Sequence, residues 1–305
     1  MRKIVAGSRG SQLALIQTQS VVDRLKKANP HIQVGINKVV TQGDRDRRTP
    51  LERLGGVGVF VKELEEALLD GRIDFAVHSL KDVPTELPQG LRLLAVLERE
   101  DPRDVLVARS RLNELPAGAR IGSDSLRRAV QLYQLRPDIE VCSIRGNVDT
   151  RLRKVASGEY DGAIVAAAAL LRLGWEDRIT EYLPLERFLP APGQGALVIE
   201  ARADDDEIAR LMSPINYLPT WQSVAAERAF LLALGGGCRA PIAALGTVSG
   251  SILRLEGMEG DVSSKKILRA SDEGPASAPE ELGERLAQRL LAMGASEFIE
   301  KAKLP

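Results

Sequence analysis

Short apolar runs and amphipathic segments alternate along the first part of the chain. Runs rich in β-branched residues predict strands near residues 2–7, 32–40, 73–78 and 91–97. Apolar positions at helical spacing predict helices near 11–28 and 60–70, where Pro30 stops the first helix and Gly71 suits the end of the second. This alternation is typical of a parallel or mixed sheet that is covered by helices.

A second α/β segment lies between two breaks in this pattern. The breaks are the charged stretch 98–104 and the proline- and glycine-rich stretch 189–196. Between them the pattern predicts strands near 104–108, 119–122, 139–144 and 161–166, and helices near 125–135, 147–157 and 167–174. The strand-like run 197–201 then indicates that the chain leaves the first domain and returns to it, with a cleft between two lobes.

A third segment begins after the stretch 213–219. Its pattern predicts a helix near 220–234, short strands between 242 and 271, and a final helix from about 279 to 302. The expected domains are 1–97 with 196–214, then 101–190, then 219–305. The fold class is therefore α/β, with two lobes, a discontinuous first domain and a smaller C-terminal α+β domain.

Composition excludes several functional classes. Forty-two basic and 42 acidic residues balance, and aromatic residues make up 4% of the chain, which argues against a nucleic-acid partner. The longest apolar run, 163–171, is far shorter than the ~18 residues that suggest a membrane span. The basic start has no apolar stretch suited to export, and two cysteines with two histidines predict a reducing, cytoplasmic location without a zinc site.

The two cysteines stand in different surroundings. Cys142 lies in an alternating, strand-like segment, where a small buried thiol is expected. Cys238 follows a run of three glycines after a predicted helix. Glycines have no side chains and leave space around the thiol, so Cys238 could carry an attached group. The alternative is a helix cap followed by an inert, buried thiol.

Three predicted strand-to-helix junctions combine glycine, a hydroxyl or amide side chain, and arginine. They span residues 7–11, 122–128 and 144–151. Helix N-termini and exposed backbone amides favour anions, and arginine matches carboxylate or phosphate geometry, so together they predict a polyanionic ligand. Singly, each could be an ordinary helix cap beside a solvated arginine. No turn has the glycine spacing of a dinucleotide or nucleotide-phosphate loop.

One carboxylate emerges among these cations. Lys81 and Asp82 follow the predicted strand 73–78, so both should reach the same sheet edge. Asp82 could merely bond the turn ahead of Pro84, and His78 could be a satisfied strand histidine. In a cleft that binds anions, however, a carboxylate is costly unless it handles a developing cation or a proton.

Five motifs closely resemble porphobilinogen deaminase, also called hydroxymethylbilane synthase. They are VHSLKDVP at 77–84, SLRR at 125–128, RGNV at 145–148, PGQGA at 192–196 and GGC at 236–238. The resemblance runs in order from residue 4 to the C-terminal helix. It implies two lobes like periplasmic binding proteins, the first discontinuous, and a third domain. The implied activity joins four porphobilinogen molecules head to tail, releases ammonia and hydrolyses the product off as hydroxymethylbilane.

The same resemblance implies the site. Cys238 would carry a dipyrromethane cofactor through a thioether, and Asp82 would stabilise the cation left by ammonia loss and move protons. Residues implied to hold the cofactor are Lys81, Asp82, Ser125, Arg127, Arg128 and Gly195. Residues implied to hold porphobilinogen and the growing oligopyrrole are Arg9, Ser11, Arg145, Asn147, Arg151, Arg172 and Gln194. Metal ligands, nucleic acid and membrane are not implied, and a monomer is expected.

Four positions depart from the family pattern. Val57 and Gln42 stand where basic residues are common, Asp124 lies in a usually hydroxyl-rich turn, and Gly235 replaces a usual glutamate.

The sequence leaves two rival functions open. One is a non-catalytic binding protein for polycarboxylates, and the other is a transferase or hydrolase with Cys238 as nucleophile and His78 as base.

Overall fold

The computed structural model describes residues 3–41, 61–236, 240–296 and 298, and its contacts divide the chain into two compact units. Unit 1 comprises Met1–Arg99 and Ala196–Trp221, and unit 2 comprises Glu100–Gly195 and Gln222–Pro305. The first unit is therefore discontinuous, as predicted. The finer three-domain division stays a prediction, because the contacts place the second and third expected domains in one unit.

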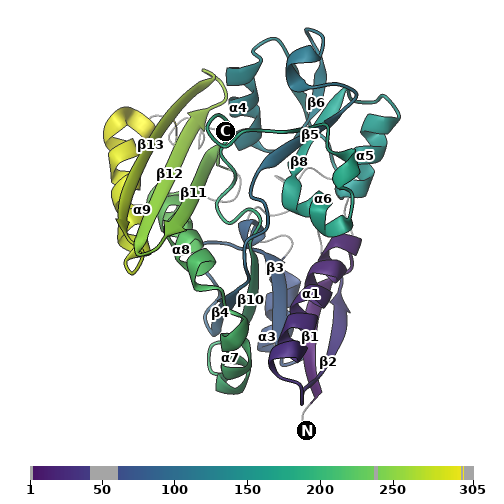
Figure 1. Cartoon of the computed structure of the whole chain (residues 1–305), viewed down its shortest axis with the longest axis vertical. Coiled ribbons are helices and arrows are strands. Elements are labelled where there is room, and N and C mark those ends of the chain that lie inside the picture. Colours follow the sequence, from purple (N-terminus) through teal and green to yellow (C-terminus); the bar gives the residue numbers. More distant parts are fainter. Residues whose placement is uncertain (1–2, 42–60, 237–239, 297, 299–305) are drawn as a thin grey trace. The chain divides into compact units, whose positions relative to one another are not determined.

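Unit 1 is built on a five-stranded mixed sheet (Figure 1). Its strands are β1 (Lys3–Arg9), β2 (Gln33–Val39), β3 (Phe75–Ser79), β4 (Leu91–Val96) and β10 (Leu197–Arg202). Their order is β2-β1-β3-β10-β4, with β1 parallel to β2 and β3, and β10 antiparallel to β3 and β4. The returning strand β10 thus completes the sheet of the first lobe.

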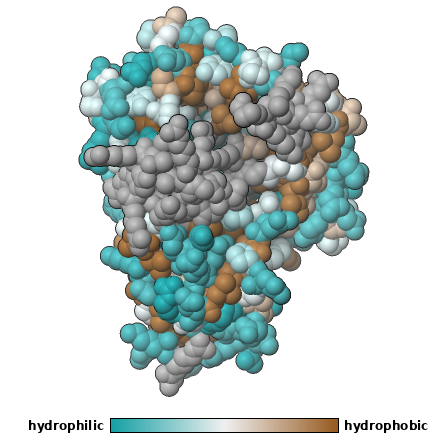
Figure 2. Space-filling model, turned by 180° about the vertical axis from the view of Figure 1, so that it is seen from behind, coloured by the Kyte–Doolittle hydropathy of each residue, from teal (hydrophilic) through white to brown (hydrophobic). Residues whose placement is uncertain are grey.

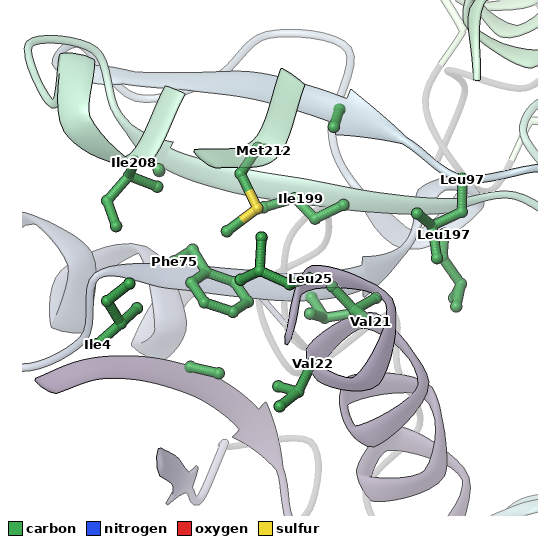
Figure 3. Packing of buried hydrophobic residues seen from close by; sticks show 14 residues of the cluster. Ile4, Val21, Val22, Leu25, Phe75, Leu97, Leu197, Ile199, Ile208 and Met212 are labelled. Atoms are coloured by element: carbon green, nitrogen blue, oxygen red, sulfur yellow. The ribbon is translucent and has the colours of Figure 1, made fainter. Parts of the chain in front are cut away.

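Helices pack on both faces of this sheet. They are α1 (Gln12–Ala28), α3 (Lys62–Leu69) and α7 (Asp206–Met212), with 3-10 turns η2 (Leu80–Asp82) and η5 (Ser213–Ile215). On one face, Val21 and Val22 of α1 pack with Phe75 and with Met212 of α7 (Figure 3). On the other face, the apolar side of α3 packs against Ala76 of β3. Helix α7 was not predicted from the sequence.

The first part of unit 2 contains a second five-stranded sheet. Its strands are β5 (Asp104–Ala108), β6 (Arg120–Gly122), β7 (Glu140–Cys142), β8 (Gly162–Ala166) and β9 (Glu181–Tyr182), in the order β7-β6-β8-β5-β9. Strand β6 is parallel to β7 and β8, whereas β5 is antiparallel to β8 and β9. Its helical segments are η3 (Leu112–Glu114), α4 (Leu126–Leu135), α5 (Val148–Ala156), α6 (Ala167–Leu173) and η4 (Glu176–Arg178).

The C-terminal part of unit 2 is an antiparallel three-stranded sheet packed against helices. Its elements are α8 (Leu218–Ala233), which begins in unit 1, β11 (Ile242–Ser249), β12 (Ile252–Asp261), β13 (Lys266–Pro275) and α9 (Pro279–Leu290). Figure 1 shows α9 along one face of this sheet. Gly257 lets the sheet approach α8, since a Cβ there would lie 2.5 Å from the Phe230 ring. The α/β fold class with a smaller α+β C-terminal domain is confirmed.

Two expectations for this region were wrong in detail. The three strands are not short, because both hairpins pair along their whole length: β11 has eight residues, and β12 and β13 have ten each. Gly250 at φ +61° lies in the tight turn between β11 and β12, and Lys265 at φ +57° lies in the turn between β12 and β13. The final helix does not run unbroken to 302. Helix α9 ends at Leu290 and continues as the π-helical segment η6 (Leu291–Ala295), because Gly294 adopts φ +105°.

The outside of the molecule is mostly polar on the face visible in Figure 2. Hydrophilic residues, shown in teal, predominate there over smaller hydrophobic areas. This agrees with the burial of most large apolar side chains inside the two units. Across the described ranges, no helix is long and apolar enough to cross a bilayer.

Candidate functional site

The strand β3 leads straight into the turn that carries Lys81 and Asp82. The amide of Leu80 donates to the carbonyl of Ala196 (3.0 Å), which fixes η2 to the start of β10. Lys81 and Asp82 are half-buried, and the carboxylate of Asp82 makes no hydrogen bond or ion pair with another described residue. The carboxylate therefore keeps its acceptor capacity for a ligand, and a bond from it to the turn ahead of Pro84 is not seen.

His78 is a buried strand residue rather than part of the exposed edge. Its Nε2 lies 3.0 Å from Oε2 of Glu200 on the neighbouring strand β10, and Glu200 is fully buried. Glu65 of α3 belongs to the same buried group, and burial together with the charge of Glu200 raises the pKa of Glu65 to about 7. His78 therefore lies in the core within ion-pair distance of Glu200, although neither His78 Nε2 nor Glu200 Oε2 makes a hydrogen bond in the described part of the chain.

The first predicted junction connects β1 to α1 in unit 1. Arg9 ends the strand, and Ser11 caps the helix by accepting a hydrogen bond from the Ala14 amide (3.2 Å). Because β1 and β3 are parallel neighbours, this junction and the Asp82 turn lie at the same edge of the sheet. Unit 1 therefore brings Arg9, Ser11, Lys81 and Asp82 to one edge.

The other two junctions meet in unit 2. Strands β6 and β7 are parallel neighbours with Gly122 opposite Cys142, so the turns that follow them share one sheet edge. Ser125 caps α4 by accepting from the Arg128 amide (3.4 Å), whereas Asn147 at the start of α5 makes no side-chain cap. Gly146 adopts φ +112°, a conformation that a side chain would strain.

Asp104, at the start of β5, organises the two arginines of the second junction. Arg127 Nη1 donates to its Oδ2 (2.7 Å), and Arg128 donates to its Oδ1 through Nη2 (2.6 Å) and Nε (3.0 Å). Arg127 and Arg128 are only 4% and 7% exposed. Burial lowers the pKa of Arg127, with Asp104 opposing that shift and Arg128 adding to it. The sequence reasoning missed Asp104, although its position where the charged stretch enters a strand was a signal.

The PGQGA segment is tied into the same part of unit 2. Gln194 is fully buried, and its Nε2 donates to the Pro102 carbonyl (2.7 Å) and to Asp104 Oδ1 (3.1 Å). Arg172 Nη2 donates to the Gly195 carbonyl (2.6 Å). These contacts give Gln194, Gly195 and Arg172 structural partners, and their roles toward a ligand remain proposals.

A cluster of guanidinium groups lies at the shared edge of β6 and β7. Burial lowers the pKa of Arg151, the nearby charges of Arg128 and Arg145 act in the same direction, and Asp124 opposes them. Arg151 Nε donates to the Gly146 carbonyl (2.9 Å), which fixes the side chain on its own junction. Crowded, partly desolvated cations of this kind bind carboxylates well.

The remaining predicted positions divide into two groups. Cys238, Val57 and Gln42 lie outside the described residues. Gly235 adopts φ +67° where α8 ends, so a glutamate at this position would be strained and the departure suits the local backbone. Cys142 is half-buried, because β7 is an edge strand, so the expectation of a buried thiol was wrong.

The chain is similar over nearly its whole length to known porphobilinogen deaminases. That of Pelobacter propionicus is 48% identical over 301 residues, covering 98% of this chain and 97% of that protein. That of Syntrophus aciditrophicus is 46% identical over 296 residues, covering 96% and 97%.

Solved structures give a weaker likeness. The BenM effector-binding domain with benzoate is 16% identical with a TM-score of 0.43, covering 70% of this chain and 90% of that chain. A probable amino-acid ABC transporter extracellular-binding protein from Bacillus subtilis is 12% identical with a TM-score of 0.43, covering 70% and 90%. Values this low support no functional conclusion.

Two family descriptions match successive parts of the sequence. Residues 4–210 match "Porphobilinogen deaminase, dipyromethane cofactor binding domain", and residues 221–292 match "Porphobilinogen deaminase, C-terminal domain". Together they span both units and the motifs on which the resemblance rests. The chain belongs to the porphobilinogen deaminase family.

Proposed function

We propose that the protein joins four porphobilinogen molecules head to tail on a dipyrromethane primer linked to Cys238, and releases hydroxymethylbilane and ammonia. The observation that carries this proposal is the family match across both units, with Asp82 and Cys238 present at the matching positions. When bound, the primer supplies a nucleophilic pyrrole carbon. The protein supplies charge, orientation and proton transfer.

The cations of unit 2 suit a ligand that carries many carboxylates. Each porphobilinogen has an acetate and a propionate, so a growing chain adds two negative charges with every step. Arg145 and Arg151 lie at the edge where the β6 and β7 junctions meet, and the charge of Arg145 contributes to the lowered pKa of Arg151. We assign Arg145, Asn147 and Arg151 to incoming substrate or extended chain, together with Arg9, Ser11, Arg172 and Gln194.

The primer's carboxylates fit a second set of donors. Ser125, Arg127 and Arg128 lie at the junction of β6 and α4, and Lys81 lies beside Asp82. Asp104 already neutralises part of the charge of Arg127 and Arg128. These buried arginines would therefore attract the primer's carboxylates mainly through the positive charge that Asp104 leaves uncompensated. Gly195 completes this proposed set.

Asp82 is the proposed catalytic residue. Loss of ammonia from porphobilinogen leaves a cation, and a carboxylate close to the pyrrole nitrogen lowers its energy by direct attraction. The same oxygens can accept the proton released when the new bond forms. Asp82 is suited to both roles because its carboxylate makes no internal pair with a described residue. The family also suggests a monomer acting in the cytoplasm, without nucleic-acid, membrane or metal partners.

Intact mass under denaturing conditions tests the covalent part of this proposal. Active protein should carry the mass of two deaminated porphobilinogen units. Cys238→Ser should lose that mass and the activity, whereas the control Cys142→Ser should keep both. An active protein of unmodified mass would overturn the tether.

Turnover of Asp82→Asn tests the catalytic assignment. The substitution keeps the shape of the side chain and removes the charge, so we expect a loss of about 10²-fold or more in kcat with the fold retained. Binding of porphobilinogen without turnover by the unaltered protein would instead favour a polycarboxylate-binding protein. Unchanged kinetics in Asp82→Asn would refute its catalytic role.

A further inference from the structure

Asp124 places a negative charge at the edge where the second and third junctions meet. Its Oδ1 accepts from Ser143 Oγ (2.6 Å) and from the Ile144 amide (3.1 Å), so it joins the two turns. Its Oδ2 lies 3.5 Å from Arg151 Nη2. The first two contacts are short, whereas the third is long enough to be exchanged for a ligand carboxylate.

The cations around this contact come from three segments, and Arg145 and Arg128 act on Arg151, the partner of Asp124. Arg151 lies on α5, Arg145 lies in the loop before it, and Arg128 lies on α4. Arg128 is paired with Asp104, and Asp124 is the carboxylate that opposes the downward shift in the pKa of Arg151. Asp124 and Arg151 are each about one-fifth exposed, so water screens their interaction only in part.

We propose that Asp124 is a specificity-determining residue that acts as a resident counter-ion of Arg151, competing with substrate carboxylates for this guanidinium. The inference rests on the proposed function for the identity of the substrate, a pyrrole bearing carboxylates. A substrate carboxylate that reaches Arg151 must displace the Oδ2 contact and approach the charge of Asp124. The resident carboxylate therefore weakens binding at this subsite while keeping Arg151 in place before the substrate arrives.

Asp124→Asn separates the charge from the structural contacts. The amide oxygen can still accept from Ser143 and from the Ile144 amide, and Arg151 keeps its bond to the Gly146 carbonyl. Removing one like charge near a bound carboxylate should lower the KM for porphobilinogen about three- to tenfold at low salt, with kcat changed less than about twofold. The difference should vanish near 0.5 M salt, because screening removes it.

Asp149→Asn provides the matched control. Asp149 lies on α5 and pairs with Arg153 on the exposed face of the helix, so this variant makes the same change in net charge outside the cluster. Its KM should remain within about twofold of the original value, because an exposed pair contributes little. Asp124→Ser, which keeps a hydroxyl acceptor, should act like Asp124→Asn and provides a second variant in case the amide disturbs folding.

A binding probe keeps this inference separate from the proposed reaction. Calorimetry with benzenehexacarboxylate, which needs no turnover, should give a lower Kd for Asp124→Asn and an unchanged Kd for Asp149→Asn. If the unaltered protein fails to turn over porphobilinogen, the proposed reaction falls, and the probe still decides the role of Asp124. Equal or weaker binding of the probe by folded Asp124→Asn at low salt would overturn the inference.

Discussion

Glu259 gives a sharp test of how burial sets charge in this fold. It lies on β12 opposite Ile242 of β11 and Leu268 of β13, on the face of the sheet packed against α8 and α9. The residue is 2% exposed, and its Oε2 has no hydrogen-bond partner in the described part of the chain. Burial alone raises the pKa of Glu259 from its usual 4.5 to about 7.

The expected effect on stability follows from proton linkage. In the unfolded chain Glu259 loses its proton near its usual pKa, whereas in the folded chain it keeps it up to about pH 7. Between these values the folded state binds more protons, so the free energy of unfolding falls as the pH rises. A shift from 4.5 to about 7 amounts to about 3 kcal/mol of stability that is present below pH 4.5 and lost above pH 7.

Glu259→Gln removes the titration and keeps the size of the side chain. Urea unfolding followed by circular dichroism, from about pH 5 to about pH 8.5, should show the variant gaining about 2–3 kcal/mol relative to the original across this range. The exposed residue Glu284 of α9 gives the control Glu284→Gln, which should show no such trend. A pH-independent difference between Glu259→Gln and the original chain would refute the reasoning.

Two further predictions concern the other buried charges. Glu65→Gln should abolish a second loss of stability between pH 4.5 and about 7, because burial and the charge of Glu200 raise the pKa of Glu65 to about 7. Unfolding curves at both ends of this range, with the exposed Glu66→Gln as control, check it. The same pH dependence of stability in both variants would contradict it. Asp104→Asn should destabilise unit 2 by about 3 kcal/mol or more, because it leaves the buried guanidinium groups of Arg127 and Arg128 without their counter-charge. Hydrogen exchange of the β5 and β8 amides measures this loss. Protection equal to that in the control Asp149→Asn, which removes an exposed charge, would contradict the prediction.

The fold could be predicted largely from local sequence patterns. Strands such as β8 are short continuous apolar runs, and α1 ends where Asn29 and Pro30 interrupt its pattern, so both were found close to their observed positions. The return of β10 to the first sheet also followed from two chain breaks. Helix α7 was missed because its seven residues carry only two buried apolar positions, Ile208 and Met212, too few for a clear period.

The candidate site could be predicted as a set of residues but not as a set of contacts. Glycine, serine and arginine at a strand end are visible in the sequence, and the structure places the second and third junctions on neighbouring parallel strands. The partners of those arginines are far away in the chain. Asp104 lies 23 residues before Arg127, and Glu200 lies 122 residues after His78, so only the folded sheet brings them together.

Because 42 basic and 42 acidic residues balance, the pairing of individual charges decides where an anion can bind. A chain with no net charge attracts an anion only where cations are held without equal neighbouring carboxylates. Arg153 and Asp149 cancel on the exposed face of α5, whereas Arg151, on the same helix, faces Arg145 and Arg128 with the longer 3.5 Å contact to Asp124. If this edge binds carboxylates as we propose, its affinity depends on how strongly Asp124 holds Arg151, and Asp124→Asn measures that dependence directly.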